Sequence, residues 1–254
     1  MGRLADKDSD IRQQRRLSGA ANAADFSEAL ARGLSVLSAF GAERRRLTQA
    51  DLARELGLSR ATVRRAVLTL EHLGYLVADG RTYELTPRVL RLAAGYLSSN
   101  TVSSVLQPVC DRITARLGEA CSVAVLDGED AVIVARAVPN RLIALGSNIG
   151  YRTPVAISSL GKVLLAHLTP PPTDPSPIGS STVERIRADG YSYVAHDIER
   201  GSHSIAVPLR RWDGRVIAAL HVGCVIERID PDTMHGEVLS LLRETAAELA
   251  PQLI

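Results

Sequence analysis

The stretch at residues 47–85 constrains the fold more than any other, because its turn and cap residues suit two short helices followed by a hairpin. Thr48 can cap the first helix, and Gly57 can end it. Ser59 can cap a second helix over residues 60–72, with an apolar stripe on one side and basic residues on the other. This spacing predicts a helix-turn-helix, whose second helix enters the major groove of DNA.

The residues that follow predict a wing. Two strand patterns, at 75–78 and 81–85, flank Asp79-Gly80, a strong signal for a two-residue hairpin turn that places Arg81 at the tip. Because caps, turn, basic helix and hairpin agree, we expect a winged helix-turn-helix that binds double-stranded operator DNA. The residues expected at the DNA are Thr48, Gln49, Ser59, Arg60, Ala61, Thr62, Arg64, Arg65 and Arg81. The alternative is a winged helix used for protein contacts, which salt-dependent duplex binding would exclude.

Charge is spread unevenly along the 254 residues. Residues 1–100 contain 16 Lys/Arg against 11 Asp/Glu, and the remainder contains 14 against 17, which suits a DNA reader joined to a domain with another task. The three cysteines, at 110, 121 and 224, lack the spacing of a metal or redox motif, so we expect reduced thiols and no metal or cofactor. No apolar run is long enough to cross a membrane, and we expect a cytoplasmic protein without a membrane partner.

Composition and pattern divide the chain into four parts. A helix from Asp25 to about Phe40, with Phe26, Leu30, Leu34 and Leu37 on its apolar face, would complete the core of the winged domain. The expected parts are a flexible arm at 1–24, a winged helix-turn-helix domain at 25–86, a linker helix starting at Thr86-Pro87 and spanning 87–100, and a second domain at 101–254.

The second domain alternates helix and strand patterns, which predicts an α+β fold with an antiparallel sheet flanked by helices and a pocket between sheet and loops. The expected helices span 108–117, 158–168, 182–189 and 231–249, and the expected strands span 122–126, 131–137, 141–146, 191–198, 204–210 and 216–224.

The alternative to a DNA-binding protein is an enzyme. Ser159 and Lys162 have the Ser-x-x-Lys spacing at which a lysine can activate a serine, as in a serine hydrolase, but the companion motifs of that class are missing. His196, Asp197, Glu199 and His203 could be imagined as metal ligands around one strand. Ordinary strand and loop roles explain them better, so we expect neither catalysis nor a metal site.

Four segments together resemble the IclR family of bacterial transcription regulators, over about residues 26–250. They are LARELGLSRATVRRAVLTLEHLGYL, ELTPRVLRLAAGYL, PVAISSLGKVLLA, and IERGSHSIAVPLR with DGRVIAALHV. The forms SRATVRRAVLTLEHLGYL and LTPRVLRL are most similar to the branch that regulates aromatic-acid catabolism, as in the protocatechuate, 4-hydroxybenzoate and β-ketoadipate pathways. Another branch, responding to glyoxylate- or pyruvate-like acids, is the alternative.

The resemblance implies a winged helix-turn-helix, a linker helix and a GAF-like effector domain that binds a small organic acid. It also implies a homodimer or a dimer of dimers, and contact with RNA polymerase if the protein is an activator. The family's effector positions correspond to Leu142, Leu145, Thr153, Ser159, Leu160, Val194, Ser202, Ser204, His221 and Gly223.

This set combines apolar walls with hydroxyls and an imidazole, which suits a small polar ligand. The chain departs from the family at Val194, where a polar or acidic residue is common. It also departs at Ser202-His203-Ser204, because the aromatic-acid branch usually has Leu-Arg-Ser at this place, so that His203 stands where that branch has an arginine. His203 would bind a carboxylate only when protonated. Arg152 is a second candidate for that role, with a surface ion pair as its alternative.

Overall fold

The computed structural model describes residues 26–41, 44–99, 101–139, 148–169, 176–196 and 200–253. The chain divides into two compact units, 1–95 and 96–254, and the hydrophobic clusters of the two are separate. The predicted arm at residues 1–24 lies outside the described residues.

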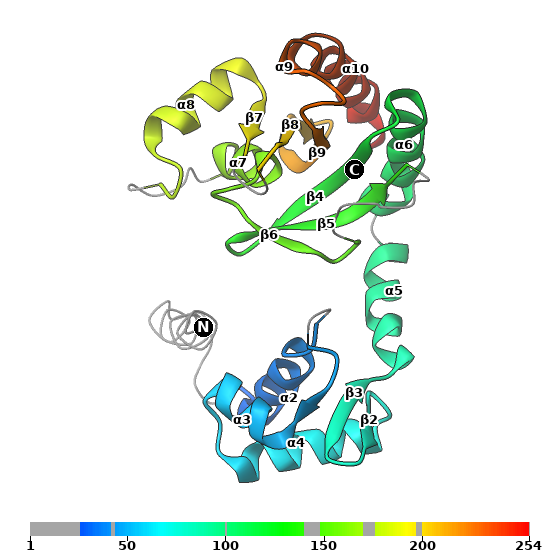
Figure 1. The fold of residues 1–254 in the computed structure, drawn as a ribbon, viewed down its shortest axis with the longest axis vertical. Helices are drawn as coiled ribbons and strands as arrows, with labels where there is room; N and C mark the ends of the chain where they lie inside the picture. The colour runs from blue at the N-terminus through cyan, green and yellow to red at the C-terminus, as the bar shows by residue number, and fades with distance from the viewer. Residues whose placement is uncertain are drawn as a thin grey trace. The chain divides into compact units, whose positions relative to one another are not determined.

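The first unit is a three-helix core closed by a small antiparallel sheet (Figure 1). Its helices meet around Val36, Leu52, Val63 and Val67, which are all fully buried. The elements are α2 (Glu28–Ser38), β1 (Leu47–Thr48), α3 (Gln49–Leu56), α4 (Arg60–His72), β2 (Leu76–Asp79) and β3 (Thr82–Leu85). Strand β3 pairs with both β1 and β2, so the hairpin is tied to the segment before α3. The predicted winged helix-turn-helix is confirmed.

Helix α2 differs from its prediction in its start and in the face it buries. Ser27 caps it by accepting a hydrogen bond from the backbone N–H of Leu30, and the predicted cap Asp25 lies outside the described residues. Of the apolar side chains expected on the buried face, Leu37 packs against the core. The other three are largely exposed, namely Phe26 (48%), Leu30 (64%) and Leu34 (53%). Val36 is buried instead. The helix is apolar on more than one side, so periodicity alone could not select the buried side.

Thr86 caps the turn that follows β3, at the position where the sequence predicts the start of the next helix. Its hydroxyl accepts a hydrogen bond from the N–H of Arg88 and donates one to the carbonyl of Gly74. A short 3-10 turn η1 (Pro87–Val89) follows and leads into α5 (Leu90–Ser99). Proline at the first position costs the turn nothing, since its N–H would have no partner there.

The second unit is a six-stranded antiparallel sheet in the order β6-β5-β4-β9-β8-β7, with helices on both faces (Figure 1). Helices α6 and α10 pack on one face, and α7 and α8 pack on the other. This confirms the predicted α+β architecture. The strands are β4 (Ala120–Asp127), β5 (Asp130–Ala137), β6 (Arg152–Pro154), β7 (Ser192–Ala195), β8 (Ser202–Arg210) and β9 (Val216–Val225). The helices are α6 (Thr101–Leu117), α7 (Ser159–Ala166), α8 (Ser180–Asp189), α9 (Pro231–Thr233), the π-helical turn η2 (Met234–Val238), α10 (Leu239–Leu249) and the turn η3 (Ala250–Gln252).

Two details of this unit correct the sequence prediction. Helix α6 begins at Thr101 and runs through Pro108, where the sequence pattern placed its start. Proline usually marks a helix boundary because it lacks an N–H and crowds the preceding turn, and here the longer helix tolerates it. The short strand β6 was not predicted, and the strand expected at 141–146 lies outside the described residues.

Candidate DNA interface and ligand site

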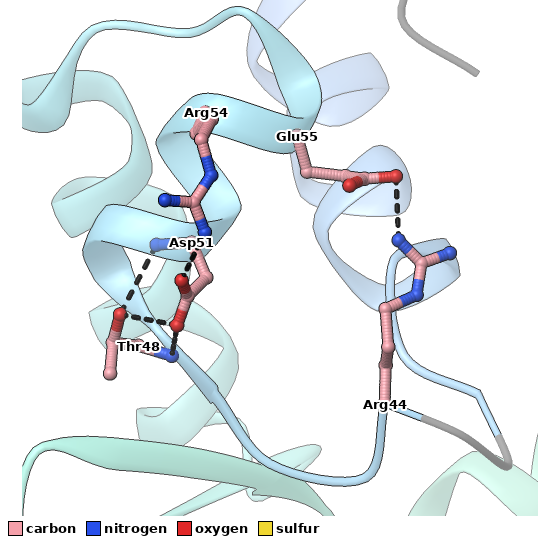
Figure 2. A network of polar contacts seen from close by, with 5 residues as sticks. All are labelled: Arg44, Thr48, Asp51, Arg54 and Glu55. Carbon is pink, nitrogen blue, oxygen red and sulfur yellow. Dashed lines mark hydrogen bonds and ion pairs between the residues drawn. The ribbon is translucent and has the colours of Figure 1, made fainter. Parts of the chain in front are cut away.

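The N-terminus of α3 is fixed by a complete capping box, shown in Figure 2. The Thr48 hydroxyl accepts a hydrogen bond from the N–H of Asp51 at 3.1 Å, and the Asp51 carboxylate accepts one from the N–H of Thr48, also at 3.1 Å. The same carboxylate pairs with Arg54 at 2.6 Å. These contacts to Asp51 lower the pKa of its carboxyl, the bonds to Thr48 most of all, and so hold it charged. Thr48 and Asp51 therefore set where α3 begins, which orients the helix pair.

Replacing Thr48 by Ala should remove the cap and the bond that the Thr48 hydroxyl donates to the Asp51 carboxylate at 2.7 Å, whereas the backbone N–H of residue 48 is kept. We expect the first unit to lose about 1 kcal/mol of stability, the usual cost of losing a threonine cap. The measurement is urea unfolding of T48A followed by far-UV circular dichroism. Thr48→Ser keeps the hydroxyl and should stay within about 0.5 kcal/mol of wild type. Equal losses in both variants would show that the threonine methyl, and not the cap, carries the effect.

Helix α4 presents its basic residues to solvent. Ser59 caps the helix, accepting from the N–H of Thr62 at 3.2 Å, and the two hydroxyls lie 2.9 Å apart. Val63, Val67 and Leu70 are buried on the opposite face. The exposed side chains are Arg60, Ala61, Arg64 and Arg65, and none of these arginines forms an ion pair within the described residues. Of the residues predicted at DNA on this helix, the arginines are thus available for contact, whereas Ser59 and Thr62 already serve the cap.

The wing carries Arg81 at its tip. Asp79 pairs with Thr82 across the hairpin, so the turn consists of Gly80 and Arg81, one residue later than the sequence prediction of Asp79-Gly80. Gly80 adopts a left-handed conformation (φ 61°), which a side chain at this position would disfavour. Arg81 is exposed at the turn, as expected for a phosphate contact.

Other polar residues of this region support the wing itself. Arg46 forms ion pairs with Asp79 at 3.1 Å and with Glu84 at 2.5 Å, so it braces the hairpin. Gln49, predicted at the DNA, donates from its amide to the Tyr83 hydroxyl at 2.9 Å and links α3 to β3. Such intramolecular contacts keep wing and helix pair in one geometry.

In the second unit, a polar cluster lies on the sheet face covered by α7. Ser158 caps α7 by accepting from the N–H of Gly161, and this places the next residue, Ser159, against the sheet. The hydroxyls of Ser159 and Ser204 lie 2.9 Å apart, and both side chains are buried. Ser204 pairs with Gly223 on β9 and with Val194 on β7, so these three share one face. The structure therefore brings together four of the positions predicted for the ligand.

Two further polar residues belong to the same face and were missed from the sequence. Ser122 on β4 pairs with Arg136 on β5 and with His221 on β9, and directly opposed residues in a sheet point to the same side. The Arg136 guanidinium donates to the Ser122 hydroxyl at 2.9 Å. The signal in the sequence is a single arginine within the apolar strand AVIVARA, because a charged residue is seldom buried unless it has a partner.

His221 is held as a neutral imidazole. Desolvation, the larger cause, and the positive charge of Arg136 together lower its pKa to about 3. Its Nδ1 is buried and has no hydrogen-bond partner in the described part of the chain. The ring lies across Gly223, where an added Cβ would come within 3.0 Å of the imidazole. A buried nitrogen of this kind costs free energy unless a partner arrives.

The depressed pKa of His221 predicts acid sensitivity. An unfolded histidine binds a proton below about pH 6.5, whereas the folded one resists it until about pH 3. The unfolded state therefore holds more protons in this window, and stability should fall with falling pH, by up to about 1.4 kcal/mol per pH unit. Between pH 7.5 and pH 5.0, the free energy of unfolding measured in urea should fall less for H221N than for wild type. An equal fall in both proteins would mean that folded His221 is protonated in this pH range.

The two residues expected to meet a carboxylate lie elsewhere. Arg152 is at the surface and pairs with Asp127 at 2.6 Å and Asp130 at 3.1 Å, which is the surface ion pair considered as its alternative. His203 faces the other side of the sheet. There its Nδ1 lies 3.0 Å from the Tyr193 hydroxyl and its Nε2 lies 3.3 Å from the sulfur of Cys224. Adjacent strand residues point to opposite faces, so Ser204 and His203 could not both line one pocket.

The remaining predicted ligand positions are partly placed. Leu160 is buried on α7, Thr153 pairs with Ala131 on the α7 side of the sheet, and Ser202 lies two residues before Ser204 on the same strand. Leu142 and Leu145 lie outside the described residues.

Ser159, the candidate serine nucleophile, lies inside the second unit. The Ser159 hydroxyl is fully buried, and its hydrogen-bond partner is the neutral hydroxyl of Ser204. In the described ranges, no group of three His, Cys, Asp or Glu side chains is placed to hold a metal ion. No helix among the described residues combines the length and the apolar character needed to cross a membrane.

Both units of the chain match domains of known proteins. Residues 29–80 match the IclR helix-turn-helix domain, and residues 94–175 and 172–250 match the C-terminal domain of the bacterial transcriptional regulator IclR. The chain is 36% identical to the Pca regulon regulatory protein of Pseudomonas putida, over 90% of this chain and 85% of that protein. It is 35% identical to the p-hydroxybenzoate hydroxylase transcriptional activator of Acinetobacter baylyi, over 89% and 91% of the two chains.

A solved structure is similar over both units. It is an IclR homolog from Microbacterium hydrocarbonoxydans in complex with 4-hydroxybenzoate, with a TM-score of 0.70 and 26% identity. The match covers 89% of this chain and 99% of that one.

Proposed function

Because the chain belongs to the IclR family of bacterial transcriptional regulators and is a ligand-responsive DNA-binding protein of that family, we propose that its ligand is an aromatic or ring-cleavage organic acid. The observation that carries the proposal is the buried cluster of hydroxyls, imidazole and guanidinium on the α7 face of the sheet. Two relatives above 30% identity support it, since their names refer to the Pca regulon and to p-hydroxybenzoate hydroxylase. A glyoxylate- or pyruvate-like acid is the second candidate, because the same hydroxyls would suit a smaller acid.

The DNA-binding half of the proposal rests on α4 and the wing. Arg60, Arg64 and Arg65 are exposed on one helix and can reach base edges or phosphates in a major groove, and Arg81 can reach the backbone from the wing tip. The positions of α3, α4 and the wing are fixed by the caps and the bridging bond of Thr48, Gln49, Ser59 and Thr62. These four residues lie at the N-terminal ends of α3 and α4, and any contact they make with DNA is made there. Their capping and bridging bonds support this assignment.

The proposed function also assigns a role to each part of the chain, an oligomeric state and a protein partner. We assign a flexible arm to 1–24, the DNA-binding domain to 25–86, a linker helix to 87–100 and the effector domain to 101–254. The protein acts in the cytoplasm as a homodimer or a dimer of dimers, because a two-fold assembly places two recognition helices in successive major grooves of a pseudo-palindromic operator. An activator of this kind would also contact RNA polymerase.

A thermal-shift screen of the purified protein tests the ligand class. The panel contains 4-hydroxybenzoate, protocatechuate, β-ketoadipate, glyoxylate and pyruvate, each at several concentrations. A ligand that binds only the folded state raises the midpoint, and the shift grows with concentration. We expect this for an aromatic or ring-cleavage acid. A shift confined to glyoxylate or pyruvate would establish the second candidate and refute the first.

A further inference from the structure

We propose that the end of β8, the hairpin that follows it and helix α10 form a docking surface for an acidic segment of another protein. The surface consists of Arg210, Arg211, Trp212, Arg215 and Arg243 around a groove beside β8, and we call it the basic edge surface. Its residues differ from those of the polar cluster under α7 and from those of the DNA interface. The inference is therefore independent of the ligand class proposed above.

A groove of about 250 Å³ lies at the edge of β8. Strand β7 pairs with β8 only as far as Ala206, so residues 207–210 form an open edge of the sheet. Pro208 lines the groove from β8, and Ala246 and Ala250 line it from α10. Pro208 lacks the N–H that a further strand would need at this edge. The groove is therefore suited to an apolar side chain of a partner and not to a partner strand.

Two arginines line this groove and keep their charge available. Arg210 and Arg243 are both exposed. The Arg210 guanidinium donates to the carbonyl of Gly214 at 3.0 Å, and the Arg243 guanidinium donates to the carbonyl of Asp189 at 2.7 Å. A carbonyl orients an arginine without neutralising it, and neither arginine forms an ion pair within the part of the chain that the structure describes. This surface is thus basic within a stretch, 101–254, that contains 14 Lys/Arg against 17 Asp/Glu.

The hairpin beside the groove exposes a tryptophan. Trp212 is the only tryptophan of the chain, and it is 70% exposed. Its turn is braced by Asp213, which accepts hydrogen bonds from the Arg211 guanidinium at 3.1 Å and from the N–H of Arg215 at 3.0 Å. The Arg211 guanidinium also lies over the indole, 5.8 Å from the ring centroid. A braced turn loses little freedom on binding, and Trp and Arg are enriched among the residues that dominate the binding energy of protein interfaces.

These features favour an acidic protein segment over DNA as the occupant. Aspartate and glutamate side chains can pair with Arg210 and Arg243 through two parallel hydrogen bonds each. An apolar side chain between them can fill the groove and cover Trp212, which removes apolar surface from water. The DNA backbone is charged throughout and has no such side chain, and Arg211 is already paired with Asp213.

The test is a selection of random-sequence peptides displayed on phage, carried out on the full chain with counter-selection on the variant R210Q/R243Q. We expect the peptides that only wild type retains to be rich in Asp and Glu around an apolar residue. By fluorescence anisotropy, a selected peptide should bind W212A about 30-fold more weakly than wild type. Its affinity for R112Q, which removes an exposed arginine from α6, should be unchanged.

The emission of Trp212 provides a local measurement without any substitution. Because the chain has a single tryptophan, a bound peptide that lacks tryptophan should move this emission to shorter wavelength as the indole leaves water. If R210Q/R243Q does not fold, W212A replaces it in the counter-selection, since its side chain is largely in solvent.

Three results would overturn the inference. The first is a selection that yields no acidic peptides specific to wild type, and the second is equal peptide affinity for W212A and wild type. The third is that R210Q/R243Q loses oligomers in sedimentation or loses binding to a scrambled duplex, which would assign the surface to a second copy of the chain or to DNA. None of these measurements uses the small ligand, so failure of the proposed ligand class would leave this inference intact.

Discussion

Gly161→Ala should destabilise the second unit by about 3 kcal/mol or more, because the added methyl group has no space. An added Cβ at Gly161 would lie 2.3 Å from the Cα of Val155 and 2.6 Å from its carbonyl oxygen. Both are backbone atoms, which cannot rotate away, so α7 or the segment after β6 has to move. For a unit of this size the thermal midpoint should fall by roughly 6–12 °C.

The same displacement should weaken ligand binding. Gly161 lies two residues after Ser159, so a shift of α7 separates the Ser159 hydroxyl from Ser204. The control is Gly33→Ala in helix α2, where nothing lies within 4 Å of an added Cβ. That substitution should stabilise the first unit by up to about 1 kcal/mol, since alanine favours a helix interior over glycine. A G161A protein as stable as wild type would show that α7 is not held this close to Val155.

Arg64→Ala should weaken operator binding by about 1–3 kcal/mol, or roughly 5- to 150-fold. Arg64 is exposed in the second turn of α4, and the fold of the helix does not depend on it because the core face consists of Val63, Val67 and Leu70. Fluorescence anisotropy on a duplex selected from a random-sequence pool would give the affinity. Binding to a scrambled duplex and the salt slope would then show whether the lost contact was to a base or to a phosphate.

The matched control is Arg185→Ala on α8. Arg185 is also exposed on a helix, and its loss changes the net charge by the same amount. We expect R185A to bind the operator as wild type does and both variants to bind the ligand with unchanged affinity. Equal operator affinity for R64A and wild type would remove Arg64 from the interface.

Local chemistry made the winged domain predictable from the sequence. Thr48, Gly57 and Ser59 are cap residues whose geometry is fixed within a few positions of the chain, and each occupies its expected place. The hairpin turn was misplaced by one residue because both Asp79-Gly80 and Gly80-Arg81 contain the glycine that the turn needs. Helix α2 was less predictable, since which of its apolar sides is buried depends on packing partners distant in sequence.

The proposed ligand site was less predictable because its residues come from β4, β5, α7, β8 and β9. Arg136, Ser122 and His221 form one row only once three strands are in register, and no short-range pattern contains that register. The alternation within a strand did, however, contain one usable signal. His203 and Ser204 are adjacent on an extended strand, so they had to face opposite ways, and placing both in one pocket was an avoidable error.

The measurement that tests the central claim most directly is operator binding with and without the ligand found in the screen. A ligand-responsive regulator predicts that saturating ligand changes the operator Kd by about 5- to 150-fold, and that saturating operator changes the ligand Kd by the same factor, because coupling between two sites is reciprocal. The contradicting result is an operator Kd that stays the same when calorimetry shows the ligand bound.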